Sequence, residues 1–357
     1  MRIVKICSIF ALLLINSLFA CTGIFLKTKD GSYIHARTLE FGIDLKSNIL
    51  FVPRDYDFTA LTPKGRPDGL RWKSKYAAIG TNAVNAIDFV DGVNEVGLSG
   101  GLFYFPGFAK FEYIEPENYN NSLPMWQLLT WILTSFETVD EVKKALPSVL
   151  VSDAIFPGLN MDMPAHLTVH DLAGNSIVIE YLNGKLNIFD NPLGVITNSP
   201  NFDWHLTNLR NYINLSPIAA KDKMMSGIKF SPLGQGSGML GVPGDFTPPS
   251  RFVRAVSFVQ ATPEIGSELE GVKSAFHILN NFDIPKGIAV DEQGYSDYTL
   301  WTSAIDTKNK IFYYRPYDNF QLQKIDLMQM DLNAKAPQLF SMKHDEEIID
   351  VNNLLAV

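Results

Sequence analysis

Short apolar and β-branched runs, separated by turn residues, recur along most of this 357-residue chain. Residues 22–26 and 33–39 flank Lys29-Asp30-Gly31, and an Asp-Gly pair between two such runs is a strong cue for a β-hairpin. The remaining strand-like runs are residues 49–52, 76–80, 86–90, 98–104, 167–169, 177–182, 185–189, 299–306 and 311–315. The three runs between 167 and 189 predict an antiparallel meander.

Helical spacing of apolar residues is found between these groups of strands. Thr138 and Glu141 have the spacing of a capping box at the start of one helix, and Ser250 is predicted to cap another. The predicted helices are residues 125–136, residues 139–146, the segment that follows Ser250, and residues 269–279.

Groups of strands separated by pairs of helices favour an α+β fold in which helices cover antiparallel sheets. We find no internal repeat, low-complexity tract or linker in the sequence. Residues 21–357 are therefore predicted to form a single layered domain.

The N-terminus has the pattern of an export signal. Two basic residues precede an apolar run at residues 9–15, and Ala20 supplies the small residue expected before a cleavage site. This predicts a removable leader over residues 1–20, which is too short to span a membrane, and an exported, periplasmic or secreted protein. A lipoprotein signal also ends at a cysteine, so acylation of Cys21 as a membrane anchor is the alternative.

The composition excludes some partners. Without the leader the chain has 28 Lys and Arg against 38 Asp and Glu, a formal charge of −10, which is unfavourable for nucleic-acid binding. Apolar residues make up 46% and aromatic residues 12%, enough for a large core and an apolar pocket. The sequence has no second apolar run long enough to span a membrane.

Cys21 is the main candidate for chemistry. Cys7 leaves with the leader, so Cys21 is the single cysteine of the mature chain and forms no internal disulfide. Cleavage before it would expose a thiol and a free α-amine on one residue, which is a nucleophile and a base together.

Four polar residues are candidates to assist Cys21. Arg37 and Glu40 are on the strand predicted to pair with the one that Cys21 begins; the guanidinium would favour a thiolate and the carboxylate would orient the amine. The alternative is an ordinary cross-strand ion pair. Asn94 and Asn198 are in predicted loops and could donate to an oxyanion, although each, taken singly, is better explained as a turn residue.

Metal and phosphate sites are not indicated. His166 and His170 are in a predicted strand, where residues four apart are separated by about 13 Å, too far to share a metal ion. The glycine-rich residues 234–238 follow no clear strand and precede no Lys-Ser/Thr pair, so they predict a flexible loop. We therefore expect neither a metal nor an organic cofactor.

Several sequence blocks resemble the choloylglycine hydrolase family, which includes conjugated bile salt hydrolases, penicillin V acylases and N-acyl homoserine lactone acylases. The blocks, in order, are CTG at the cysteine, DG nine residues later, Arg37, DGVNEVGL, VITNSPNFDWHLTNL, LGQGSGMLGVPGDFTPPSRF and TLWTSAIDTKNKIFYY. The resemblance implies an N-terminal nucleophile (Ntn) hydrolase with a four-layer αββα sandwich.

The resemblance also implies roles for six residues. Cys21 resembles the nucleophile, Arg37 the arginine beside its thiol, Asn94 and Asn198 the oxyanion-hole asparagines, and Arg251 the remaining active-site arginine. Glu40 is where many members have aspartate, so its carboxylate reaches one methylene further.

The implied substrates are linear amides with bulky apolar acyl groups. Residues 103–108 and Trp301 could line a pocket for them. The sequence leaves penicillin V, acyl homoserine lactones and conjugated bile salts open, and export slightly favours the first two. The family resemblance suggests a homotetramer or dimer. The competing class is a lipid-anchored, non-catalytic binding protein of the same fold.

Overall fold

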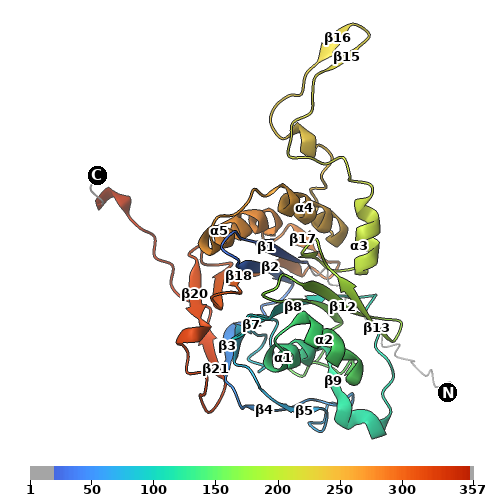
Figure 1. Cartoon of the computed structure of the whole chain (residues 1–357), viewed down its shortest axis with the longest axis vertical. Coiled ribbons are helices and arrows are strands. Elements are labelled where there is room, and N and C mark those ends of the chain that lie inside the picture. The colour runs from blue at the N-terminus through green and yellow to red at the C-terminus, as the bar shows by residue number, and fades with distance from the viewer. Residues whose placement is uncertain (1–19, 354–357) are drawn as a thin grey trace, which may run out of the picture.

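The computed structural model describes residues 20–353, so the predicted leader lies outside the described residues except for Ala20. Two antiparallel sheets are stacked face to face, with helices on both outer faces (Figure 1). Helices α4 and α5 pack on one sheet and α1 on the other. The predicted α+β class and the four-layer αββα sandwich of the Ntn-hydrolase fold are therefore confirmed.

The first sheet has seven strands in the order β14-β1-β2-β18-β19-β20, with β17 paired to β18. Its strands are β1 (Cys21–Lys27), β2 (Tyr33–Phe41), β14 (Val195–Ile196), β17 (Ala289–Val290), β18 (Ser296–Asp306), β19 (Ile311–Pro316) and β20 (Gln323–Asp326).

The second sheet has eight strands in the order β13-β12-β11-β8-β7-β6-β3-β21. Its strands are β3 (Asn48–Val52), β6 (Ala78–Thr81), β7 (Asp91–Asn94), β8 (Ser99–Tyr104), β11 (Ala165–His170), β12 (Ser176–Leu182), β13 (Lys185–Asp190) and β21 (Gln338–Ser341). Three further pairs are β4 (Asp57–Thr59) with β5 (Arg71–Lys73), β9 (Ser122–Pro124) with β10 (Leu150–Ser152), and β15 (Lys223–Met225) with β16 (Ile228–Phe230).

The helices are α1 (Met125–Ser135), α2 (Val139–Ala145), α3 (Phe202–Leu209), α4 (Pro248–Ala261) and α5 (Glu268–Leu279). Thr138 caps α2 as predicted, because its side chain accepts a hydrogen bond from the Glu141 N–H. The N-cap of α4 is Thr247 and not Ser250, whose hydroxyl instead donates to Asp245. Helix α3 was not predicted.

The predicted hairpin of β1 and β2 is confirmed and sets the geometry of the site. Gly31 in its turn has a φ of +80°, a conformation that favours glycine. The register pairs Cys21 with Leu39 and Gly23 with Arg37. Because paired residues of an antiparallel ladder point to the same face, Cys21 and Arg37 both face the second sheet.

Residues 86–90, predicted as a strand, form an irregular segment between β6 and β7. Val84 and Asn85 just before it have positive φ angles of 45° and 61°, so the chain turns where a strand would continue. The Phe89 N–H is then satisfied by the hydroxyl of Thr130 in α1, at 2.9 Å, and not by a neighbouring strand. This segment reaches the pocket described below.

A long arm extends from the sandwich between α3 and α4 and carries the β15–β16 hairpin at its tip (Figure 1). The predicted glycine-rich loop at residues 234–238 is on this arm. Its last two residues begin a 3-10 turn, Ser237–Met239. Among the described residues, no helix is both long enough and apolar enough to cross a membrane.

Candidate active site

Cys21 is the first residue of β1, and its side chain is buried between the two sheets. Its backbone nitrogen donates to the side-chain oxygen of Asn198 at 2.7 Å. The preceding residue, Ala20, is also buried, and its carbonyl accepts a hydrogen bond from the Glu40 N–H at 3.0 Å. The start of β1 is therefore fixed on both sides of the predicted cleavage point.

Arg251, in the first turn of α4, ties Cys21 to Asn198. Its Nη2 donates to the Asn198 oxygen at 2.7 Å, and its Nη1 donates to the carbonyl of Cys21 and, at 2.9 Å, to the hydroxyl of Thr22. Burial lowers the pKa of Arg251 to about 10, so the side chain is still a cation at neutral pH. Asn198 in turn donates from Nδ2 to the Tyr104 carbonyl at 2.7 Å.

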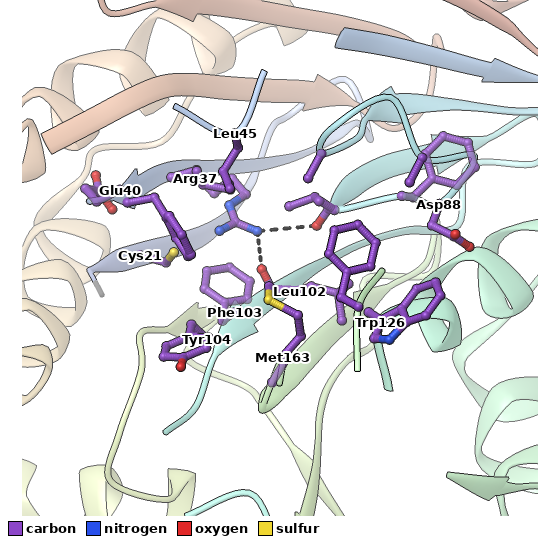
Figure 2. A pocket seen from close by; sticks show the side chains of 18 residues that line it. Cys21, Arg37, Glu40, Leu45, Asp88, Leu102, Phe103, Tyr104, Trp126 and Met163 are labelled. Carbon is purple, nitrogen blue, oxygen red and sulfur yellow. Dashed lines mark hydrogen bonds between the residues drawn. The ribbon is translucent and has the colours of Figure 1, made fainter. Parts of the chain in front are cut away.

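Arg37 holds a second positive charge on the face of β2 that Cys21 shares. Its guanidinium carbon is 4.1 Å from the centroid of the Phe103 ring, and Nη1 donates to the carbonyls of Val90 and Leu102 (Figure 2). These contacts come from the second sheet and the segment before it, so the guanidinium is fixed where the two sheets meet.

Glu40 is three residues beyond Arg37 in β2, so its side chain is on the opposite face of the strand, toward α4. The Thr299 hydroxyl donates to its carboxyl group at 2.9 Å. Burial raises the pKa of Glu40 to about 8, and the charge of Arg251 opposes this rise. Glu40 thus joins Arg251 on the side of the sheet that faces the helices.

Opposing effects act on the Cys21 thiol. Burial raises its pKa, and the charges of Arg37 and Arg251 act in the opposite direction. Glu40 raises the pKa further when ionised, whereas its backbone N–H lowers it by hydrogen bonding. Since burial is the largest of these effects, the sulfur needs a base to become a thiolate at neutral pH.

The sulfur is at one end of a mainly apolar pocket, with Asp88 and Trp126 toward the other end (Figure 2). The pocket is lined by Cys21, Arg37, Leu39, Glu40, Phe41, Leu45, Ala83, Ala86, Asp88, Phe89, Val90, Leu102, Phe103, Tyr104, Trp126, Phe156, Met163 and Ala165. A buried sulfur with two cations nearby and an apolar pocket in front of it suits attack on an amide with an apolar acyl group.

Comparison with known proteins decides the family. The profile described as linear amide C-N hydrolases, choloylglycine hydrolase family, matches residues 21–340. The chain belongs to this family. As a choloylglycine hydrolase family member it is an amidase that acts on linear amide C–N bonds.

Named relatives agree with this assignment. A bile salt hydrolase/transferase of Clostridium perfringens is 33% identical over 334 residues, which is 93% of this chain and 100% of the relative. A penicillin V acylase of Pectobacterium atrosepticum is 26% identical over 336 residues, 87% of this chain and 82% of the relative.

Solved structures agree on the fold. A crystal structure of a variant of conjugated bile acid hydrolase from Clostridium perfringens superposes with a TM-score of 0.83 at 32% identity, covering 93% of this chain and 100% of that one. The structure of penicillin V acylase from Agrobacterium tumefaciens superposes with a TM-score of 0.73 at 23% identity, covering 90% of this chain and 92% of that one. This similarity supports the fold alone.

Five of the six predicted site residues of this choloylglycine hydrolase come together, but Asn94 does not join them. It is at the end of β7, and its Nδ2 donates to the carbonyls of Leu133 and Phe136 at the C-terminal end of α1. Its side-chain oxygen accepts from the N–H groups of Val96 and Leu98. Both amide hydrogens are therefore already donated, and Asn94 is not among the pocket residues.

Sequence reasoning missed several pocket residues. Tyr104, which belongs to the predicted stretch 103–108, lines the pocket as expected, but the contact of its carbonyl with Asn198 was missed. Its neighbour Phe103 lines the pocket as expected, whereas Phe108 is 41% exposed. Trp301 lies near Arg37 but does not line the pocket. Met163 comes from an irregular stretch with no sequence signal.

Within residues 20–353 no group of three or more His, Cys, Asp and Glu side chains is placed to hold a metal ion. The two spaced histidines of β11 have other partners. His166 contacts Glu180 and the Thr197 carbonyl, each at 2.9 Å, and His170 stacks on Phe25 with 4.1 Å between the ring centroids.

Proposed function

We propose that this chain is an exported acylase whose nucleophile is the sulfur of Cys21, exposed together with a free α-amine when the leader of residues 1–20 is removed. The observation that carries this proposal is the 2.7 Å contact between the Cys21 nitrogen and Asn198, beside a sulfur that faces an apolar pocket. The nitrogen that would become the amine already has an acceptor that fixes its position.

In the proposed reaction, the α-amine of Cys21 takes the thiol proton, directly or through water, because burial keeps the thiol protonated. The sulfur attacks the amide carbonyl and forms a tetrahedral oxyanion. The α-amine passes this proton to the leaving nitrogen of the substrate as the C–N bond breaks. Water then hydrolyses the thioester, which releases the carboxylic acid and regenerates the thiol. Arg37 stabilises the anionic sulfur before attack.

Asn198 is the donor that we propose for the oxyanion. One of its amide hydrogens goes to the Tyr104 carbonyl, which fixes the plane of the amide and leaves the second hydrogen for the substrate. Loss of one such donor typically costs about 2.7–4 kcal/mol of transition-state stabilisation.

The proposed substrates are N-acyl amides with bulky apolar acyl groups. The apolar pocket supports this class, as do the relatives described as bile salt hydrolases and a penicillin V acylase. Within the class, an exported enzyme would meet penicillin V or acyl homoserine lactones more readily than conjugated bile salts, so we place those two first.

Mass spectrometry of the N-terminus after expression with the native leader tests the proposal. A free cysteine at residue 21 supports it, and a diacylglyceryl cysteine supports the alternative of a lipid anchor. Cys21→Ser should fold normally and lose most amidase activity on a panel of penicillin V, acyl lactones and glyco- and tauroconjugates. Full activity of Cys21→Ser, or of a chain blocked or extended before residue 21, would refute the scheme.

We also propose a homo-oligomer, a tetramer or a dimer, that uses the arm. Apolar side chains at its tip are exposed in the single chain, among them Met224, Ile228 and Phe230. Light scattering after size exclusion should show a mass above that of one chain, and Ile228→Asp with Phe230→Asp should lower it to that of a monomer.

A further inference from the structure

We propose that His166 and Glu180 form a buried relay that positions Asn198 for catalysis, although neither side chain contacts Cys21. They are positioning residues, and the inference rests on the role proposed above for Asn198. The relay begins in the second sheet and ends at the loop that carries Asn198.

The relay has two links. The Nδ1 atom of His166 in β11 is 2.9 Å from Oε1 of Glu180 in the neighbouring strand β12, and its Nε2 is 2.9 Å from the Thr197 carbonyl. The His166 ring stacks on Phe105 with 4.2 Å between centroids and only 2° between the planes. The ring is therefore fixed in orientation, and both of its nitrogens have partners.

The direction of these hydrogen bonds follows from the partners. A carbonyl oxygen only accepts, so the His166 Nε2 must carry a proton and donate to Thr197. One further proton is then shared between Nδ1 and the Glu180 carboxyl group. Whichever of the two holds it, Nε2 remains the donor to Thr197. Glu180 therefore keeps the proton on Nε2, the nitrogen that binds the Thr197 carbonyl.

Two more contacts hold the same segment. The Glu180 Oε1 atom also accepts the N–H of Phe202, the first residue of α3, at 2.9 Å. Within α3, the Nε2 of His205 donates to the Asn198 carbonyl at 3.0 Å. The backbone carbonyls of Thr197 and Asn198 are thus gripped by two histidines, and the side chain of Asn198 is left to serve Cys21.

A purely structural role explains this arrangement poorly. His166 and Glu180 are at most 1% exposed, and the second carboxyl oxygen of Glu180 has no hydrogen-bond partner among the described residues. A buried polar pair with an unsatisfied oxygen is weak as a source of stability, because apolar residues of similar size often do as well or better. The pair holds the carbonyl of Thr197, the residue directly before Asn198, and this position favours a role in catalysis.

Glu180→Gln is the sharpest test because it removes the carboxyl group that shares a proton with His166 Nδ1 and leaves the shape of the side chain almost unchanged. An amide oxygen at the Oε1 position still accepts from Phe202, but it draws the single ring proton to Nδ1 and leaves the Thr197 carbonyl without a donor. We expect kcat to fall 10- to 100-fold with KM changed less than 3-fold. A crystal structure of the variant should show the Thr197–Asn198 segment moved away from the His166 ring.

His166 supplies the rescue comparison. His166→Gln keeps an N–H near the Nε2 position and should retain most of kcat, whereas His166→Leu should behave like Glu180→Gln. Thr168→Val is the matched control, since Thr168 is buried on the same strand and face and bonds to the Ile177 carbonyl. It should lose stability but keep kcat within 2-fold.

Wild-type kcat in folded Glu180→Gln and His166→Leu, with the Thr197–Asn198 segment unmoved, would overturn the relay. An equal loss of kcat in Thr168→Val would overturn it as well, because that would reveal a general packing effect. Failure of the proposed function gives a different result: Cys21→Ser would stay active, while the displacement of Thr197–Asn198 in Glu180→Gln would still report on the relay.

Discussion

The guanidinium of Arg37 lies over the ring of Phe103, with 4.1 Å between the guanidinium carbon and the ring centroid. Arg37 belongs to β2 of the first sheet and Phe103 to β8 of the second, so the contact bridges the two stacked sheets. Trp301 flanks the same charge at 5.5 Å. Aromatic faces and backbone carbonyls therefore hold a buried cation beside the Cys21 thiol.

Replacing Arg37 with methionine should make the Cys21 thiol a weaker acid. The charge of Arg37 lowers the thiol pKa against the effect of burial, so its loss should raise that pKa further and slow alkylation at pH 7. The measurement is the rate of Cys21 alkylation by iodoacetamide as a function of pH, together with amide turnover.

The control for this substitution is Arg254→Met. Arg254 also has its guanidinium over an aromatic ring, that of Phe282 at 4.8 Å, but it is not among the residues that line the pocket. Its loss should leave the alkylation profile of Cys21 unchanged. An unchanged profile in Arg37→Met would contradict the role given to Arg37.

Asp91 should make the fold less stable as the pH rises from about 4 to about 6. Burial raises its pKa from 3.8 to about 6, opposed by Arg37 and by the Ser303 hydroxyl, which donates at 2.6 Å. In this window the unfolded chain releases the proton while the folded chain keeps it, so the free energy of unfolding falls with rising pH, by about 3 kcal/mol.

Asp91→Asn should remove this contribution. Urea denaturation at pH 4 and pH 6.5 measures the change in the free energy of unfolding for each protein, and the change should be smaller in the variant. Ser303→Ala should act in the opposite direction, because the hydroxyl lowers the Asp91 pKa and its loss widens the window. Equal changes in Asp91→Asn and the parent would count against this assignment.

The hairpin that presents Cys21 could be predicted from the sequence because its information is local. An Asp-Gly turn between two β-rich runs fixed both strands, and the register then placed Arg37 on the same face as Cys21. Helices with a long apolar stripe, such as α1 and α5, were predicted for the same reason, since the stripe itself is the signal.

Features determined by packing against distant segments could not be predicted in this way. Residues 86–90 have strand-like composition, but their N–H at Phe89 bonds to a helix and the chain turns before them. Helix α3 is only eight residues long, about two turns, and its first N–H is satisfied by Glu180 from another strand. Contacts of this kind leave no spacing pattern in the sequence.

Gly23→Ala should disturb the site through packing. A Cβ atom at Gly23 would come within 2.6 Å of the Phe103 ring and 2.8 Å of the Ile196 side chain, both buried. We expect a loss of about 1–3 kcal/mol in the free energy of unfolding, as for other overpacked cores. Turnover should also fall because Phe103 supports Arg37.

Gly234→Ala is the matched control for Gly23, since a Cβ there would meet nothing within 4 Å. Its stability and turnover should equal those of the parent. Thermal denaturation and amide turnover of the two variants, measured side by side, check the pair. A Gly23→Ala protein as stable and as active as Gly234→Ala would show that the two sheets are not held as closely as described.

Asn94 and Asn198 should differ in their effect on kcat when each is replaced by alanine. In Asn94→Ala, the carbonyls of Leu133 and Phe136 lose their common donor, and the N–H groups of Val96 and Leu98 lose an acceptor. Leaving buried polar groups without partners costs about 1–3 kcal/mol for each group, so a clear loss of stability is expected. The kcat of the folded fraction should be unchanged, because Asn94 has no free donor for the substrate.

Asn198→Ala should in addition reduce kcat by about 100- to 1,000-fold, the effect of losing one oxyanion donor. It should also lose stability, because the Cys21 N–H and Arg251 lose an acceptor and the Tyr104 carbonyl loses a donor. Chemical denaturation and active-site titration of both variants separate the two effects, because titration counts the folded, reactive protein. Asn94→Ala could instead lose kcat per active site as Asn198→Ala does. The Asn94 amide would then have to turn toward the substrate during the reaction, and its assignment as a structural partner of the carbonyls at the end of α1 would fail.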